Sequence, residues 1–261
     1  MSKLYSFLLK IRPTFISLAL KKILGIKRIV IKAKYGEFFV DPVSNFGNTL
    51  LTTKEYEPHM LEIIEENLRE GDTFIDIGAN EGFFSIVASK IVGPTGKVYT
   101  VEPQERLQEI IRKNVNLNGT DNIQFIKKAI SDKKGETNIF LAPNTNTGSS
   151  SLVNPQTYYL PTQKVQTDTL QNILDEMNID TIDLAKIDVE GFEYETILGS
   201  KQLFVERRIK RIVLEIHYYN LLDRDLDSND ISNFLEGCGY RITEHHNLWF
   251  IVAEDASKIP A

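Results

Sequence analysis

The sequence has little cysteine and no long apolar run. Cys238 is the one cysteine among 261 residues, which excludes an internal disulfide and any structural zinc site that needs two cysteines from one chain. The longest uncharged stretch near the N-terminus, residues 13–20, is far shorter than the ~20 residues of a membrane-spanning helix. Lys10 and Arg12 interrupt the apolar run that a secretory signal would keep. We therefore expect a cytoplasmic protein that folds on its hydrophobic core alone.

Acidic residues are missing from the first 34 positions. The rest of the chain holds 21 basic and 36 acidic residues, whereas residues 1–34 hold nine basic ones. These nine are Lys3, Lys10, Arg12, Lys21, Lys22, Lys27, Arg28, Lys32 and Lys34. An acidic body repels phosphate at long range, so we do not expect nucleic acid as a partner.

From Gly71 onward, short apolar strands alternate with helical segments. The expected strands are 73–77, 97–101, 123–126, 182–187 and 212–216, and the expected helices are 82–91, 106–117, 170–177, 192–198 and 231–235. This alternation predicts an α/β fold with a mostly parallel sheet, which binds ligands at the carboxyl ends of its strands. Residues 240–243 and 248–252 predict a closing hairpin, so one strand should be antiparallel.

The first 54 residues predict an elaboration in front of one domain that spans residues 55–261. Residues 29–31 and 38–40 flank a Gly turn and predict a β-hairpin. Residues 3–24 predict a basic amphipathic helix that Pro13 kinks or divides. Its apolar face is formed by Leu4, Leu8, Ile11, Phe15 and Leu18. Two interpretations stay open: this face docks on the domain or on a second subunit of a homo-oligomer, or it makes a peripheral contact with an anionic membrane.

The strongest local motif is the glycine-rich turn of residues 76–82, which follows an expected strand. Glu102, at the end of the next strand, could accept hydrogen bonds from ribose hydroxyls. Asn80 stands where a dinucleotide fingerprint has its middle glycine, and Asp76 and Glu81 would repel a pyrophosphate. S-adenosylmethionine carries an ammonium and a sulfonium, so we favour it over NAD. The structural alternative is that the glycines only permit a tight turn.

Two further motifs follow the next strands. Period-two alternation places Lys186 and Asp188 on one face of a strand, with Asp188 at its carboxyl tip. Asp188 could orient a substrate, act as a base or ligate a cation. Glu215 and His217 likewise share a face, and His217 could take a proton from a hydroxyl. The alternatives are structural, since acids near a helix start are favourable by themselves and a single histidine is often part of the packing.

Together these segments resemble the FkbM-type methyltransferases, a Rossmann-like class that uses S-adenosylmethionine. The matching stretches are residues 56–58, 71–82, 101–103, 129–132, 186–193 and 214–217. The resemblance implies a seven-stranded sheet with one antiparallel strand, and a methyltransferase domain over residues 55–261. It also implies methyl transfer to a hydroxyl of a small-molecule secondary metabolite or of a sugar in a surface glycan.

The resemblance also implies roles for single residues. It places Asp76, Gly78 and Asn80 around the methionine part of the cofactor. Glu102 would hold the ribose, and Ser131 and Asp132 would lie near the adenine. Glu57 would close over the cofactor.

The catalytic residues that we expect are His217, Asp188 and Lys186, with His217 the preferred base and Asp188 the second choice. A bound Mg²⁺ could instead lower the pKa of the hydroxyl. We do not favour a metal; its ligands would be Asp188, Glu190 and Glu215.

Two other functions stay open at this point. A nucleic-acid methyltransferase is disfavoured, because residues 188–191 are acidic and lack an aromatic clamp for an extruded base. A catalytically silent binding module with the same fold is the second alternative. The Ser- and Asn-rich stretch 142–168 is expected to cover the acceptor pocket, but it does not identify the acceptor.

Overall fold

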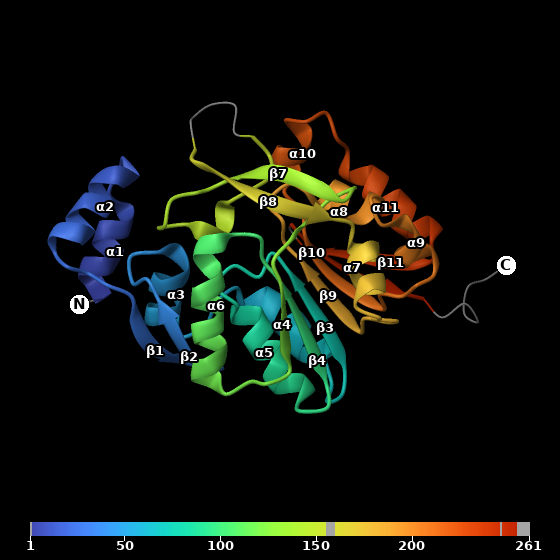
Figure 1. Cartoon of the computed structure of the whole chain (residues 1–261), viewed down its shortest axis with the longest axis horizontal. Helices are drawn as coiled ribbons and strands as arrows, with labels where there is room; N and C mark the ends of the chain where they lie inside the picture. Colours follow the sequence, from blue (N-terminus) through green and yellow to red (C-terminus); the bar gives the residue numbers. More distant parts are fainter. Residues whose placement is uncertain (1, 155–159, 246, 255–261) are drawn as a thin grey trace.

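The centre of the molecule is a seven-stranded sheet with strand order β11-β12-β10-β9-β3-β4-β5 (Figure 1). It is seen in a computed structural model that describes residues 2–154, 160–245 and 247–254. The strands are β3 (Thr73–Ile77), β4 (Lys97–Val101), β5 (Ile123–Ile126), β9 (Leu184–Ile187), β10 (Arg211–Glu215), β11 (Tyr240–His245) and β12 (Leu248–Ala253). β12 runs antiparallel to β10 and β11, and the other neighbours are parallel. This confirms the Rossmann-like sheet with one antiparallel strand.

Each face of the sheet carries its own hydrophobic core. Along β3, Phe74 belongs to one core, whereas Ile75 and Ile77 belong to the other, as the alternation of a strand requires. The first core is covered by α4 (Pro58–Asn67), α5 (Phe83–Val92) and α6 (Glu105–Asn118). The second is covered by α7 (Leu170–Glu176), α8 (Glu193–Leu198), α9 (Lys201–Val205) and α11 (Ser228–Gly237).

A small second sheet lies between α6 and α7 in the chain. Its strand order is β6-β8-β7, with β6 (Ala129–Ile130), β7 (Gly135–Phe140) and β8 (Thr162–Asp168). A short 3-10 turn, Thr147–Ser149, lies between β7 and β8. Another short helix, α10 (Tyr218–Leu222), directly follows His217. The sequence pattern does not predict α9, α10 or β6, since elements of two to five residues are too short for a period to show.

The N-terminal part contains two helices, a hairpin and a third helix. These are α1 (Ser2–Lys10), α2 (Thr14–Ile23), β1 (Ile29–Ala33), β2 (Gly36–Val40) and α3 (Asn45–Thr53). The expected helix over residues 3–24 is therefore divided at Pro13, which lies directly before α2. The hairpin is confirmed. The sequence pattern does not predict α3. The hydroxyl of Ser44 caps this helix by accepting the N–H of Gly47 at 2.9 Å.

The hairpin packs on α6. The backbone N–H of Phe39 donates to Asn114 Oδ1 at 2.6 Å, and the side-chain amide of Asn118 donates to the carbonyl of Glu37 at 2.7 Å. Phe38 and Val40 are completely buried in the core that also contains α4, α5 and α6. The hairpin and α3 thus complete one face of the central sheet, across the expected boundary at residue 54.

A buried ion pair ties this N-terminal part to the glycine-rich turn. Both terminal nitrogens of Arg28 donate to the carboxylate of Glu81, at 2.7 and 2.8 Å. The Glu81 side chain is buried, so its charge depends on Arg28 for compensation. The sequence argument counted Glu81 as a free negative charge toward a cofactor; the structure corrects this, because Arg28 neutralises it.

Within the described residues, no helix combines the length and apolar composition needed to cross a membrane.

Replacing Arg28 should destabilise the fold. Arg28→Met leaves the buried Glu81 charge without a partner, so the free energy of unfolding should fall by about 3–5 kcal/mol. Urea unfolding measures this, and Arg28→Met/Glu81→Gln should recover most of the loss because no charge is then left unpaired. Lys133→Ala, an exposed control, should behave like the parent. An Arg28→Met protein as stable as the parent would contradict a structural role for the pair.

Candidate active site

An open cavity of about 1030 Å³ lies at the carboxyl ends of the central strands. Its walls come from the residues that follow β3, β4 and β9, from the end of β10, and from the segment between β7 and β8. Phe46 of α3 and the start of α4 complete it. This is the edge at which a parallel sheet is expected to bind its ligand.

Glycine is required at the start of the turn after β3. Gly78 has φ +79, and a Cβ there would lie 1.8 Å from the carbonyl oxygen of Asp188. The backbone N–H groups of Gly78 and Ala79 both donate to the carbonyl of Val101, at 3.0 and 3.1 Å. The turn is thus held between the ends of β9 and β4, and Gly78 and Asn80 lie in the cavity wall.

Glu102 lies in the cavity wall at the end of β4. Its two carboxylate oxygens accept the backbone N–H groups of Asn80 and Gln104, each at 2.9 Å. Burial raises the pKa of Glu102 to about 7, although these two hydrogen bonds lower it. The carboxylate is therefore positioned by the backbone and short of compensating positive charge.

Lys186 is buried between the ends of β3 and β9. Its ammonium donates to the carbonyl of Gly78 at 2.9 Å and lies 3.3 Å from Asp188 Oδ2 and 3.5 Å from Asp76 Oδ1. Burial pulls the pKa of Lys186 down, but the charges of Asp188, Asp76 and Glu57 outweigh this and raise it. Its ammonium is thus held by structural contacts, so we assign Lys186 a positioning role.

Asp76 lies beneath the cavity and does not line it. It is completely buried, accepts the hydroxyl of Ser85 at 2.6 Å and faces Lys186. The expected place of Asp76 around the methionine part of a cofactor is therefore corrected: the side chain acts through Lys186.

Glu57 lines the cavity from the residue before α4. Its backbone is left-handed, with φ 44, a conformation that costs of order 1 kcal/mol for a residue with a side chain. Burial and the charge of Asp188 raise the pKa of Glu57 to about 7, against the lowering effect of Lys186. Its location is compatible with the expected role of closing over a cofactor.

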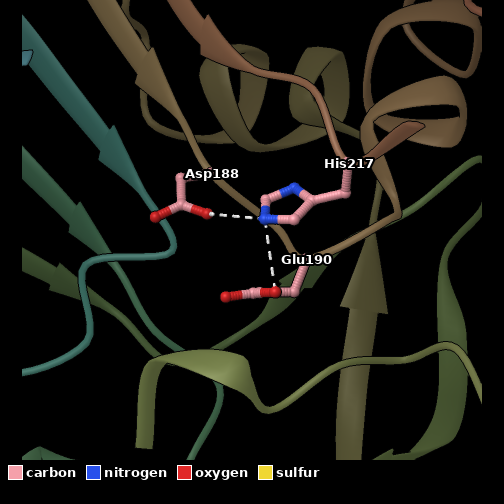
Figure 2. Close-up of side chains that lie close together, drawn as sticks. All are labelled: Asp188, Glu190 and His217. Carbon is pink, nitrogen blue, oxygen red and sulfur yellow. Dashed lines mark ion pairs between the residues drawn. The ribbon is translucent and has the colours of Figure 1, made fainter. Parts of the chain in front are cut away.

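Asp188, Glu190 and His217 converge from two segments (Figure 2). His217 Nε2 lies 3.2 Å from Glu190 Oε2 and 4.0 Å from Asp188 Oδ1, and Nδ1 lies 2.8 Å from the buried Glu193. Burial lowers the pKa of His217, but the hydrogen bond to Glu193 and the charges of Glu190, Glu193 and Asp188 raise it to about 9. At neutral pH His217 is therefore an imidazolium held by carboxylates.

The cavity wall contains Asp188 and Glu190 but not His217. Glu190 has its pKa raised to about 8, by burial and by the charge of Asp188, while His217 lowers it. The preferred base of the sequence argument thus lies behind two carboxylates, and a ligand in the cavity meets Asp188 or Glu190 first. Glu193, in the first turn of α8, is the partner that orients His217.

The group of residues that could hold a cation differs from the expected one. Ligand atoms of Asp188, Glu190 and His217 lie within 4.8 Å of one another. Glu215 also lines the cavity, but it accepts the side-chain amide of Asn247 at 2.6 Å and stands outside this group. His217 thus replaces Glu215 in the expected set.

Ser131 and Asp132 do not reach the cavity wall, contrary to the expected contact with adenine. Ser131 donates to Asp132 at 3.1 Å, and both lie against the backbone of Gly199. Residues 128–130, directly before them, line the cavity instead.

The segment between β7 and β8 covers part of the cavity, as expected for residues 142–168. Asn146, Gly148, Ser150 and Leu152 line the cavity, and the hydroxyl of Thr147 donates to Asn80 Oδ1 at 2.9 Å. Residues 155–159 of this stretch lie outside the described part of the chain.

Comparison with known proteins gives a family match and several partial relatives. The model of the family described as "Methyltransferase FkbM domain" matches residues 76–242. A segment is 40% identical over 71 residues to the protein-L-isoaspartate O-methyltransferase of Methanosarcina mazei, covering 26% of this chain and 29% of that protein. Another match, to the ribosomal protein L11 methyltransferase of Caldanaerobacter subterraneus, is 30% identical over 126 residues and covers 44% of this chain and 39% of that protein. The chain thus spans less than half the length of these curated relatives.

Among solved structures, a methyltransferase FkbM from Methylobacillus flagellatus is similar with a TM-score of 0.45 and 16% sequence identity. The alignment covers 79% of this chain and 54% of that one.

The ligand-free protein should lose stability as the pH rises from about 5 to 8. Glu57, Glu102 and Glu190 have raised pKa values, so the folded state keeps protons that the unfolded state releases above its lower pKa values. His217, whose pKa is raised to about 9, adds a further loss of stability as the pH rises to about 9. Differential scanning calorimetry across this range should show a falling Tm.

Glu57→Gln should reduce this fall, because one buried charge is removed. Each kcal/mol recovered raises the Tm by about 2–4 °C. The Tm of Glu57→Gln should therefore exceed that of the parent at about pH 8 and equal it at about pH 5. Glu105→Gln, which removes an exposed carboxylate, should keep the slope of the parent. A parent Tm that stays constant or rises over this range would refute the charge imbalance.

Proposed function

The chain belongs to the FkbM methyltransferase family, and from this premise we propose that it is an S-adenosylmethionine-dependent O-methyltransferase. The acceptor in this proposal is a hydroxyl of a sugar, in a glycan or free, or of a secondary metabolite.

The observation that supports this cofactor best is the excess of carboxylates in the cavity wall. Glu57 and Glu102 line it with raised pKa values, because burial outweighs the lowering effect of Lys186, the cation that acts on both of them. Lys186 is shared among Asp76, Asp188 and Gly78. A ligand that carries a sulfonium and an ammonium would relieve this imbalance, whereas the phosphates of a dinucleotide would increase it.

The geometry of the wall fits this cofactor. Glu102 is fixed by two backbone N–H groups at a strand end, where a carboxylate can accept hydrogen bonds from ribose hydroxyls. The backbone of Gly78 to Asn80 borders the same space, and Glu57 faces it from α4. When bound, S-adenosylmethionine supplies an electrophilic methyl carbon and leaves as a neutral thioether.

The acceptor hydroxyl must lose its proton as its oxygen bonds to the methyl carbon. We assign the proton to Glu190, which lines the cavity and is held at 3.2 Å by His217 Nε2. A base with a pKa near the working pH is the most effective. Asp188, beside it, would orient the hydroxyl, and His217 with Glu193 would hold Glu190 in place.

Mass spectrometry of products from sugar-nucleotide, glycan and polyketide acceptors, with isotope-labelled S-adenosylmethionine, tests the proposal directly. Transfer to an oxygen of one of these classes is expected. Robust methylation of bulk RNA or DNA, with none of these acceptors labelled, would overturn the acceptor class.

Glu102→Gln should weaken S-adenosylmethionine binding by about 10- to 150-fold, since a charged acceptor of the ribose hydroxyls is lost. Isothermal titration calorimetry measures the Kd. The matched control is Glu105→Gln, three residues further along and exposed, which should bind like the parent. Unchanged binding by Glu102→Gln would mean that the cofactor lies elsewhere.

Glu190→Gln should lower kcat by about 10²–10⁴-fold with cofactor affinity retained. In the parent, kcat should rise with pH through about 8, the pKa of Glu190, because only the ionised carboxylate accepts a proton.

His217→Gln separates the roles of the pair. The positive charge of His217 lowers the pKa of Glu190, so its removal should move the rise in kcat to higher pH, with activity recovered there. If His217 were itself the base, no pH would restore activity. Loss of parent activity in EDTA and its return with Mg²⁺ would instead assign the activation of the hydroxyl to a metal.

A further inference from the structure

The two N-terminal helices lie at one end of the molecule, outside the layers that cover the central sheet (Figure 1). They are attached through α3, where the hydroxyl of Ser6 donates to Asn48 at 3.0 Å, and through an ion pair between Lys21 and Asp41. Within α1 and α2 only Leu8 and Ser17 are buried. The helices are therefore fixed in place while most of their surface faces solvent.

Part of the exposed surface of these helices is apolar. Phe7, Phe15 and Ile23 are 64%, 69% and 79% exposed. On α2 the exposed positions 16, 19 and 23 are three and four residues apart, and position 15 lies four residues before position 19, so all four lie on one side of the helix. Leu4, Ile16 and Leu24 are exposed as well.

Only part of the apolar stripe of residues 3–24 packs on the domain. Of its five members Leu8 is buried, Ile11 and Leu18 are half-buried, and Leu4 and Phe15 face solvent. Packing on the domain thus accounts for only part of the apolar surface.

Exposed basic side chains occur in the same segment as this apolar surface. Arg28 and Lys21 form ion pairs with Glu81 and Asp41 respectively. The basic side chains that remain exposed in residues 2–27 are Lys3, Lys10, Arg12, Lys22 and Lys27. No acidic residue occurs in the first 34 positions. A second copy of this surface would bring like charges together, whereas an anionic lipid headgroup layer complements it and admits the apolar side chains.

We propose that α1 and α2 form a docking surface for anionic membranes. α3 connects this surface to the cavity, because α3 packs against α1, and its Phe46 lines the cavity. The N–H of Asn45 also donates to the carbonyl of Thr145 at 2.7 Å, next to the segment that covers the cavity. Resting on the proposed function, this places an acceptor carried by a lipid within reach of the site.

Cosedimentation of the full chain with vesicles tests the docking surface. The protein should bind phosphatidylcholine–phosphatidylglycerol vesicles at low salt, release them at high salt, and ignore pure phosphatidylcholine vesicles. Lys10→Ala/Lys22→Ala should weaken binding by about 25-fold, at about fivefold for each charge. Phe15→Ser/Ile23→Ser should weaken it by at least about tenfold, because apolar insertion is lost. Lys97→Ala/Lys133→Ala, two exposed lysines elsewhere, should bind like the parent.

Binding of S-adenosylmethionine serves as the fold control, and it should stay unchanged in all of these variants. Failure of the parent to bind anionic vesicles at low salt would overturn the docking surface. So would a dimer that Phe15→Ser/Ile23→Ser converts into monomers, since a second copy would then cover the surface. Failure of the proposed function is distinguishable, because it would abolish methyl transfer and leave vesicle binding intact.

Discussion

The buried ammonium of Lys186 holds the site together. It joins the carbonyl of Gly78 on one strand end to Asp188 on the neighbouring one, two points that are far apart in sequence, and it compensates the completely buried Asp76 beneath them. Without this cation, Asp76 would be a buried charge with no counter-charge, a loss of about 3–5 kcal/mol. The glycine-rich turn and the acidic motif after β9 are therefore one unit.

One cation does not balance the carboxylates around it. Glu57, Glu102 and Glu190 share the cavity wall with Asp188, and the fold tolerates this because the central sheet and its two cores determine where the strand ends lie. The site is thus less stable than the sheet that carries it, a common relation between a binding site and its scaffold. A cationic ligand would relieve this repulsion, so binding energy and fold stability are coupled here.

Regular patterns made the sheet predictable, and distant pairings limited the prediction of the site. Short apolar runs that alternate with helical segments predicted the strands, and the strand ends placed Glu102 and Asp188 at one edge. The ion pair of Arg28 with Glu81 joins residues 53 positions apart, and no local pattern indicates it. Similarly, the sequence predicts that Asp76 lines the cavity, whereas the structure buries it beside Lys186. The protonation of His217 depends on carboxylates whose distances only the fold supplies.

The packing of the β1–β2 hairpin on α6 also has a consequence for synthesis on the ribosome. The backbone N–H of Phe39 can form its hydrogen bond only after Asn114, 75 residues further along the chain, has been synthesised. At about 5–20 residues per second, this amounts to roughly 4–15 s of translation. During that interval Phe38 and Val40, which are completely buried in the finished protein, have only part of their core, because α6 has not yet been made. The nascent hairpin is therefore a segment on which a chaperone could act until α6 has been made.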